Sequence, residues 1–251
     1  MSRILVFPGN FDPICAHHMS VVSEVMMLAN KGEIGNGHWK PAHLQTTYVP
    51  FDAAWILPYN KEPFGLRELA PIADRIEMIE LAIKDCDMGD YIQVSDFEEF
   101  FNIKCGRTKA LLRFAKFYKQ NDLVFLLGKD EAVNLRLWRN SRKLTRNLSF
   151  ITVSRRDFSR GLKPDNKKSY YYRRMSDWYA FGYNSNHKYI SQNIAGNNMF
   201  GKSIREHLSA GGDRRRQMMH DPVVLTESVS DYIKEHKLYI NGDEPNEQAV
   251  S

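Results

Sequence analysis

The stretch Ile4-Leu-Val-Phe-Pro-Gly-Asn-Phe-Asp-Pro-Ile-Cys-Ala-His-His-Met19 decides the fold. An apolar run ends at Gly9, an Asp-Pro turn follows, and two histidines stand at the start of a predicted helix. Unpaired N–H groups and the positive end of the helix dipole attract anions to a helix N-terminus, and a glycine lets the backbone come close to a ligand. The stretch therefore predicts a strand–turn–helix unit that holds a phosphate, and a nucleotide site is the first hypothesis.

Strand and helix patterns alternate along the rest of the chain. Apolar runs predict strands at 4–7, 53–57, 91–94, 123–127 and 149–153, and helical periodicity predicts helices at 17–30, 72–83, 109–118, 203–209 and 226–236. The run 123–127 is apolar throughout, which is typical of a central parallel strand buried on both faces. The alternation predicts an α/β fold, a Rossmann-like doubly wound parallel sheet with helices on both faces.

One domain is expected over residues 1–240, because a chain of 251 residues with 43% apolar content suits a single α/β domain with insertions. Residues 31–52 lack periodicity, and residues 157–198 are rich in polar, basic and aromatic side chains, so both ranges are predicted to be insertions. The acidic and polar tail 241–251 is expected to be flexible.

Composition narrows the class of protein. The formal net charge is +5, and the three cysteines form no CxxC pair, which favours a reducing, cytoplasmic location. No apolar stretch approaches the roughly 20 residues that span a bilayer, and no signal peptide is predicted, so no membrane partner is expected. The scattered histidines lack metal-ligand spacing, so no metal site is predicted.

Three segment ends are expected to lie beyond the carboxyl ends of the strands, where open parallel sheets bind ligands. They are Gly9 to His18, Gly128 to Trp138, and the helix start from Gly201 to Arg205. His18 is suited to a phosphate oxygen, Asp130 to ribose hydroxyls, and Trp138 to stacking on a flat ring. Lys202 and Arg205 carry the positive charge that a departing pyrophosphate requires.

These segments carry a family resemblance. Residues 7–19 resemble the GxFDPxHxGH signature of the nucleotidylyltransferase superfamily, which supplies the ATP phosphate site. Over nearly its whole length, the chain is also similar to bacterial nicotinate-nucleotide adenylyltransferases. The other similar segments are Trp55 to Lys61, Arg75 to Met78, Leu126 to Asp130 with Trp138, Ile204-Arg205, and Val229 to Tyr239.

The chain departs from the family pattern at three places. HxGH has become Cys15-Ala-His-His18, so only His18 keeps its position. A neutral thiol is a weak hydrogen-bond donor without positive charge, which weakens a phosphate contact at residue 15. Phe200 to Lys202 replaces the Ser-Ser-Thr part of the ISSTxIR motif, and Cys105 to Thr108 contains no match to the Tyr-Thr pair that contacts the nicotinate carboxylate in the family.

The resemblance implies an adenylyltransferase in NAD biosynthesis. The phosphate of nicotinate mononucleotide would attack the α-phosphorus of ATP in line, giving deamido-NAD and pyrophosphate without a covalent enzyme intermediate. ATP is then a substrate, and Mg²⁺ arrives with its triphosphate. The implied catalytic residues are His18, Lys202 and Arg205; the implied ATP contacts are Gly9, Asn10, Phe11, His17, Gly128, Asp130, Ser203 and Ile204; the implied mononucleotide contacts are Asp12, Lys61, Thr108 and Trp138.

Alternatives stay open beside this interpretation. The acceptor could be nicotinamide mononucleotide, or the chain could be a nucleotide-binding homologue with weak or no catalysis, because Cys15 replaces a histidine. An RNA-binding module is a weaker alternative, suggested by basic groups among the aromatics of residues 170–179. No nucleic acid partner is expected, and the oligomeric state, a homo-oligomer included, is left open.

Overall fold

The computed structural model describes residues 1–30, 50–61, 68–128, 131, 135–155, 188–194, 201–222 and 224–240. Three sequence predictions concern residues outside these ranges. They are most of the two predicted insertions, the tail 241–251, and the ribose-binding role of Asp130.

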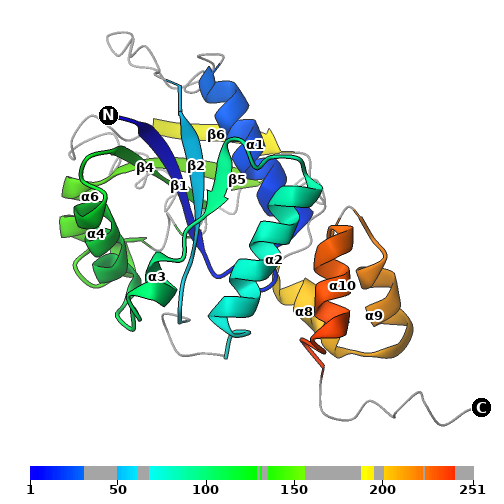
Figure 1. The fold of residues 1–251 in the computed structure, drawn as a ribbon. Helices are drawn as coiled ribbons and strands as arrows, with labels where there is room; N and C mark the ends of the chain where they lie inside the picture. Colours follow the sequence, from blue (N-terminus) through cyan, green and yellow to red (C-terminus); the bar gives the residue numbers. More distant parts are fainter. Residues whose placement is uncertain are drawn as a thin grey trace, which may run out of the picture. The chain divides into compact units, whose positions relative to one another are not determined.

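Six strands among the described residues form one sheet in the order β3-β2-β1-β4-β5-β6 (Figure 1). Their bounds are β1 Arg3–Gly9, β2 Ala53–Pro58, β3 Ile92–Val94, β4 Asp122–Gly128, β5 Ser149–Arg155 and β6 Lys188–Ile194. β4 pairs in parallel with both β1 and β5, and β5 pairs in parallel with β6. This strand order is that of the Rossmann fold, so the predicted fold class is confirmed.

The helices include every one that the sequence predicts, with ends shifted by a few residues. Their bounds are α1 Ala16–Asn30, α2 Ile72–Asp85, α3 Phe97–Phe100, α4 Arg107–Phe117, the 3₁₀ helix η1 Leu135–Leu137, α6 Ser141–Asn147, α8 Gly201–Ser209, α9 Gly212–Met219 and α10 Glu227–Glu235. The sequence did not predict α3, η1, α6 or α9. In α9 only Met218 is buried, so this helix has no apolar stripe that periodicity could detect.

Strand β6 corrects the end of the predicted insertion 157–198. It pairs with β5, with Tyr189 opposite Thr152 and Ile190 opposite Val153. β6 is the last strand in the sheet order, and an edge strand has only one neighbour along its backbone. Its sequence Lys-Tyr-Ile-Ser-Gln-Asn-Ile is more polar than that of the central strand β4. For that reason the sequence pattern does not separate it from the polar segment before it.

The chain divides into two compact units. The first unit comprises Met1–Pro8, Ser23–Trp55 and Ile103–Ala195, and the second comprises Gly9–Val22, Ile56–Asn102 and Gly196–Ser251. The sequence predicted one domain over 1–240, and both units draw their described segments from that range.

An aromatic cluster fills the core of the first unit. Phe125 of β4 lies with its ring centroid 6.3 Å from that of Phe114 and 5.9 Å from that of Phe150. All three side chains are almost completely buried. β4 is buried on both faces because it is a central strand, which confirms the expectation from its uniformly apolar sequence.

In the second unit, α2 packs against α10, and α8 packs against α9. The buried residues of α2 include Met78, Ile79 and Ala82, and those of α10 include Val229 and Ile233. These spacings of three and four residues place the apolar side chains on one stripe of each helix. The packing of α2 and α10 brings chain segments more than 140 residues apart into contact.

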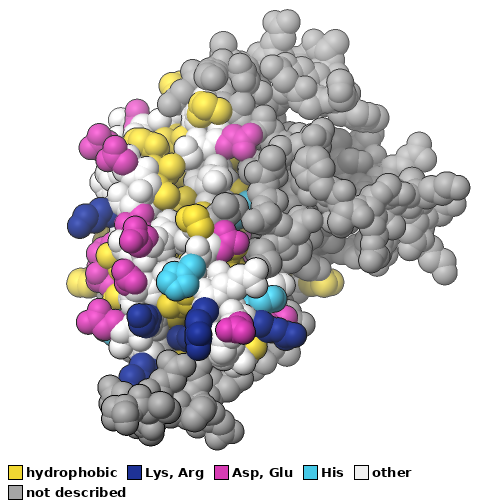
Figure 2. All heavy atoms as spheres, turned by 90° about the vertical axis from the view of Figure 1, so that its right-hand side faces the viewer, with side chains coloured by type: hydrophobic (Ala, Val, Ile, Leu, Met, Phe, Trp, Pro, Cys, Tyr) yellow, Lys and Arg dark blue, Asp and Glu magenta, His cyan; other side chains and the backbone are white. Residues whose placement is uncertain are grey.

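The surface shown in Figure 2 mixes charges of both signs. The exposed charged residues of α9 are Asp213, Arg214 and Arg216, and those of α10 include Asp231, Lys234 and Glu235, so both signs are present. The RNA-binding alternative rests on residues 170–179, which lie outside the described residues. No helix in the described part of the chain is long and apolar enough to cross a membrane.

Candidate functional site

The Gly9–His18 turn links β1 to α1 and lies in the second unit. The carbonyl of Gly9 accepts a hydrogen bond from the N–H of Tyr59 at 2.8 Å. A Cβ at residue 9 would lie 2.8 Å from Cζ of Phe11, whose side chain is buried. Glycine therefore leaves room for this ring, which cannot move aside easily inside the core.

His18 is held in one orientation by its neighbours in this turn. The N–H of Cys15 donates to Nδ1 of His18 at 3.1 Å, and Sγ of Cys15 lies 3.0 Å from the same nitrogen. The ring of Phe11 contacts His18 edge-on, with centroids 5.3 Å apart. Because a backbone N–H can only donate, Nδ1 is the acceptor, and in the neutral imidazole the hydrogen is then on Nε2.

Two backbone N–H groups at the start of α1 are used within the protein. The N–H of Ala16 donates to the carbonyl of Val224 at 2.9 Å, and the N–H of His18 donates to the carbonyl of Cys15 at 2.9 Å. The helix N-terminus was expected to bind an anion through such groups. At these two positions the amides already have partners in the protein.

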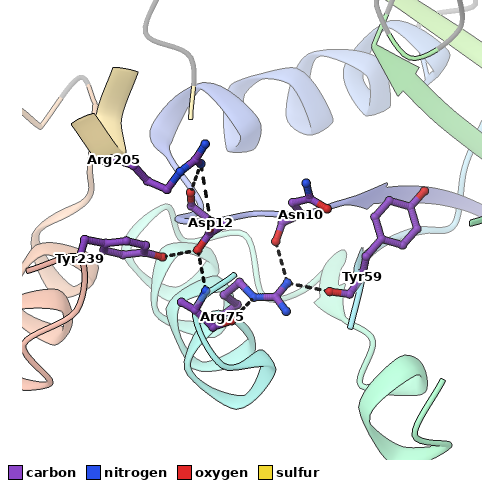
Figure 3. Close-up of polar contacts among 7 residues, drawn as sticks. Asn10, Asp12, Tyr59, Arg75, Arg205 and Tyr239 are labelled. Atoms are coloured by element: carbon purple, nitrogen blue, oxygen red, sulfur yellow. Dashed lines mark hydrogen bonds and ion pairs between the residues drawn. The ribbon is translucent and has the colours of Figure 1, made fainter. Parts of the chain in front are cut away.

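Asp12 is the centre of a polar cluster in the second unit (Figure 3). Its Oδ1 accepts hydrogen bonds from the N–H of Ala70 at 3.2 Å and from the hydroxyl of Tyr239 at 2.8 Å. Arg205 of α8 places Nη1 at 3.8 Å from Oδ2 and also donates to the backbone carbonyl of Asp12. The Asp12 side chain is 1% exposed and that of Arg205 is 20% exposed, so the arginine side chain is partly accessible to solvent.

Arg75 holds three segments of the second unit together (Figure 3). Its Nε donates to the carbonyl of Ala70, and its Nη1 donates to the carbonyls of Asn10 and Tyr59, each at 2.8 Å. The residue is fully buried. Arg75 thereby ties the beginning of the Gly9–His18 turn to the chain that follows β2.

Burial and charge also act on the hydroxyl of Tyr239. Burial raises the pKa of Tyr239 well above its ordinary value, and the negative charge and hydrogen bond of Asp12 raise this pKa further. The hydroxyl therefore remains protonated at physiological pH and acts as the donor to Asp12.

In the first unit, Trp138 contacts Arg107. The guanidinium carbon of Arg107 lies 5.3 Å from the centroid of the Trp138 ring, within cation–π range. Nη1 of Arg107 also forms a 2.7 Å ion pair with Glu131. Trp138 and Thr108 are buried, at 7% and 8% exposed. At Gly128, the end of β4, an added Cβ would have no atom of the described structure within 4 Å.

The predicted site residues therefore fall into groups. The second unit brings Asn10, Asp12 and Arg205 into one cluster, and Ile204 is buried beside it on α8. Lys61 is exposed, His17 is half-buried, and the carbonyl of Ser203 contacts Nδ1 of His207. The side chain of Lys202 and all of Asp130 lie outside the described structure.

Three residues with structural roles here were not among the sequence predictions: Arg75, Tyr239 and Arg107. The burial of Arg75 could have been predicted from the sequence. It precedes Met78 by three residues and Ala82 by seven, so it lies on the apolar stripe of α2. A charged side chain on such a stripe indicates a buried polar contact. The contact between Tyr239 and Asp12 spans 227 positions and has no local signal.

Within the described ranges, no three His, Cys, Asp or Glu side chains are grouped so that they could hold a metal ion.

Comparison with known proteins gives matches in sequence and in structure. The model of the cytidylyltransferase-like family matches residues 33–191. A probable nicotinate-nucleotide adenylyltransferase of Methylacidiphilum infernorum is 24% identical over 157 residues, which is 62% of this chain and 66% of the relative. A protein of the same description from Exiguobacterium sibiricum is 27% identical over 119 residues, covering 47% of this chain and 61% of the relative. The chain thus spans less than two thirds of the length of either relative.

The fold matches solved structures over almost the whole chain. The nicotinic acid mononucleotide adenylyltransferase of Plasmodium falciparum, complexed with APC, superposes with a TM-score of 0.62 at 18% identity, covering 95% of this chain and 98% of that one. The same enzyme complexed with NaAD superposes with a TM-score of 0.63. At this identity the likeness shows a shared fold.

Proposed function

Because the chain belongs to the cytidylyltransferase-like family, we propose that it is an adenylyltransferase that joins AMP from ATP to nicotinate mononucleotide. An oxygen of the mononucleotide phosphate attacks the α-phosphorus of ATP. The bond from that phosphorus to the oxygen bridging to the β-phosphorus breaks, and pyrophosphate leaves. The two sequence relatives support this choice by their description, and NaAD, held by the structural neighbour, is the dinucleotide that this reaction forms.

The orientation of His18 is the observation that carries the proposal. Its Nδ1 is occupied by the N–H of Cys15, so Nε2 is the nitrogen that donates. We assign this N–H to an oxygen of the α-phosphate, where negative charge grows during in-line attack. A donor fixed in advance stabilises that charge without reorganising at the moment of reaction.

Arg205 is the second group of the proposed triphosphate site. Its side chain is partly exposed and its Nη1 contacts Asp12, which fits a role in neutralising the β- and γ-phosphates. We assign Lys202, three residues earlier on α8, to the same phosphates. Mg²⁺ carried in by the triphosphate would neutralise part of its charge when bound.

The remaining assignments rest on the family resemblance. Gly9, Asn10, Phe11, His17, Gly128, Asp130, Ser203 and Ile204 are proposed for ATP, and Lys61, Thr108 and Trp138 for the mononucleotide. Asp12 is proposed to act through Arg205, since its carboxylate is buried and already engaged by the protein.

An acceptor assay tests the proposal. The protein is incubated with ATP, Mg²⁺ and either nicotinate mononucleotide or nicotinamide mononucleotide, and pyrophosphate and dinucleotide are both quantified. The expected result is equal amounts of pyrophosphate and deamido-NAD with the nicotinate acceptor. Product with the amide alone would reassign the acceptor, and ATP binding without product from either acceptor would contradict the transferase proposal.

A further inference from the structure

We propose that Tyr239, just beyond α10, is a positioning residue for phosphate binding that holds Asp12 and, through it, Arg205. This inference rests on the proposed function, because it gives Arg205 a phosphate to bind. Tyr239 itself touches no substrate in this scheme. Its part is to fix the carboxylate against which the arginine is aligned.

The two oxygens of the Asp12 carboxylate contact different residues (Figure 3). Oδ1 accepts from the N–H of Ala70 and the hydroxyl of Tyr239, and Oδ2 faces Arg205. Two donors on one oxygen fix the rotation of the carboxylate plane. Removal of the hydroxyl would take away the shorter of these two bonds to Oδ1, at 2.8 Å against 3.2 Å from Ala70, and would weaken the restraint on rotation of the carboxylate.

The position of Tyr239 is itself set by α9. Arg215 donates from Nη1 to the carbonyl of Leu208 at 2.8 Å and to that of Tyr239 at 3.3 Å, and from Nη2 to the carbonyl of Leu238 at 3.2 Å. Leu208 is on α8, the helix that carries Arg205. Arg215 thus joins the backbone around Tyr239 to the helix that presents the arginine.

This arrangement reduces the conformational entropy that Arg205 loses when it binds a phosphate. An arginine side chain loses rotamer freedom when it forms hydrogen bonds to a ligand, and alignment by the protein before binding removes part of that loss. A misdirected Arg205 would still be charged, so it would attract ATP but hold it less tightly. The expected signature is weaker ATP affinity in a variant that is still folded.

The chain provides a matched control in Tyr232 of α10. Its hydroxyl donates to Oδ1 of Asp74 on α2 at 2.9 Å, compared with 2.8 Å from Tyr239 to Asp12. Both substitutions to Phe remove one hydroxyl from a carboxylate and keep the ring. Only Tyr239 is linked to Arg205.

The experiment measures ATP affinity by calorimetry, without acceptor, for the wild type, Tyr239→Phe, Tyr232→Phe, Arg205→Gln and the double variant Tyr239→Phe/Arg205→Gln. Tyr239→Phe is expected to weaken ATP binding by up to about tenfold, because immobilising one long side chain on binding costs at most about that factor in affinity. Tyr232→Phe should bind ATP like the wild type. In the Arg205→Gln background, Tyr239→Phe should cause no further loss.

The inference is overturned if Tyr239→Phe binds ATP like the wild type, if Tyr232→Phe weakens binding equally, or if the loss persists in the Arg205→Gln background. Failure of the proposed function is seen separately, in the wild type alone. A wild type that binds ATP but makes no dinucleotide contradicts the transferase proposal and leaves the comparison of tyrosines valid. A wild type that binds no ATP overturns both.

Discussion

At the scale of single residues, Cys15 orients His18 through its backbone. The backbone N–H of residue 15, rather than its side chain, supplies the hydrogen bond that orients His18. Any residue except proline provides that donor. The hydrogen bond that directs Nε2 of His18 therefore does not depend on which of cysteine or histidine stands at position 15.

His18→Ala tests this role. Loss of one preorganised donor to the developing charge is expected to lower kcat by about 10²–10³-fold. Turnover is followed by pyrophosphate release with ATP and nicotinate mononucleotide. The exposed His220 provides the control, and His220→Ala should keep wild-type turnover. Full activity in His18→Ala would show that the imidazole does not contact the reacting phosphate.

At the scale of helices, a carboxylate at the end of α2 caps the start of α10. Asp85 accepts from the N–H of Ser228 at 3.0 Å and from its hydroxyl at 2.6 Å. Burial alone would raise the pKa of Asp85, but the hydrogen bonds from Ser228 and the charge of Lys84 contribute to lowering it overall. A negative charge here is also favourable because helix N-termini carry partial positive charge.

Asp85→Asn is expected to lower the stability of the fold at neutral pH by about 0.5 kcal/mol, because it keeps an acceptor for Ser228 but removes the negative charge at the helix N-terminus. A carboxylate whose pKa is depressed in the folded state stabilises above its unfolded pKa, 3.8, and this contribution is lost as pH falls through the folded value. The stability difference between wild type and variant should thus disappear on acidification below pH 3.8. Thermal denaturation at several pH values measures it. A constant difference down to the lowest pH would show that the charge of Asp85 does not matter.

At the scale of the whole molecule, the Rossmann strand order joins segments that are distant in sequence. Arg75 links the carbonyls of Asn10, Tyr59 and Ala70, which come from three separate parts of the chain. A buried guanidinium costs desolvation energy unless its donors find acceptors, and here three carbonyls supply them. The Gly9–His18 turn therefore owes its position to a residue outside it.

Arg75→Met keeps much of the side-chain length but leaves these three carbonyls without their donor. Each buried unsatisfied group costs about 1–3 kcal/mol, so a total loss of about 3 kcal/mol is expected. For a chain of this size that corresponds to a fall in Tm of roughly 6–12 °C. Arg216→Met, at a side chain 66% exposed, is the control and should change Tm little. Equal Tm values for Arg75→Met and wild type would contradict the structural role of Arg75.

The sequence by itself determined the alternation of strands and helices, the buried central strand β4, and the turn that ends at His18. Each of these depends on local features: periodicity, uniform apolar content, and glycine and proline at fixed positions. It missed β6 because a polar edge strand lacks that periodicity, and α9 because almost none of its residues is buried. Neither element presents a clear apolar pattern.

Only the tertiary structure decided how the cluster around Asp12 is connected. From the sequence, Asp12 and Arg205 were separate ligand contacts, and Tyr239 was the end of a helix; in the structure they contact one another across more than 190 positions. Such contacts depend on which elements are neighbours in space, and hydrophobic periodicity reports only which face of an element is buried. The residue type gives the chemical group of a side chain, and the tertiary structure determines which other group it contacts.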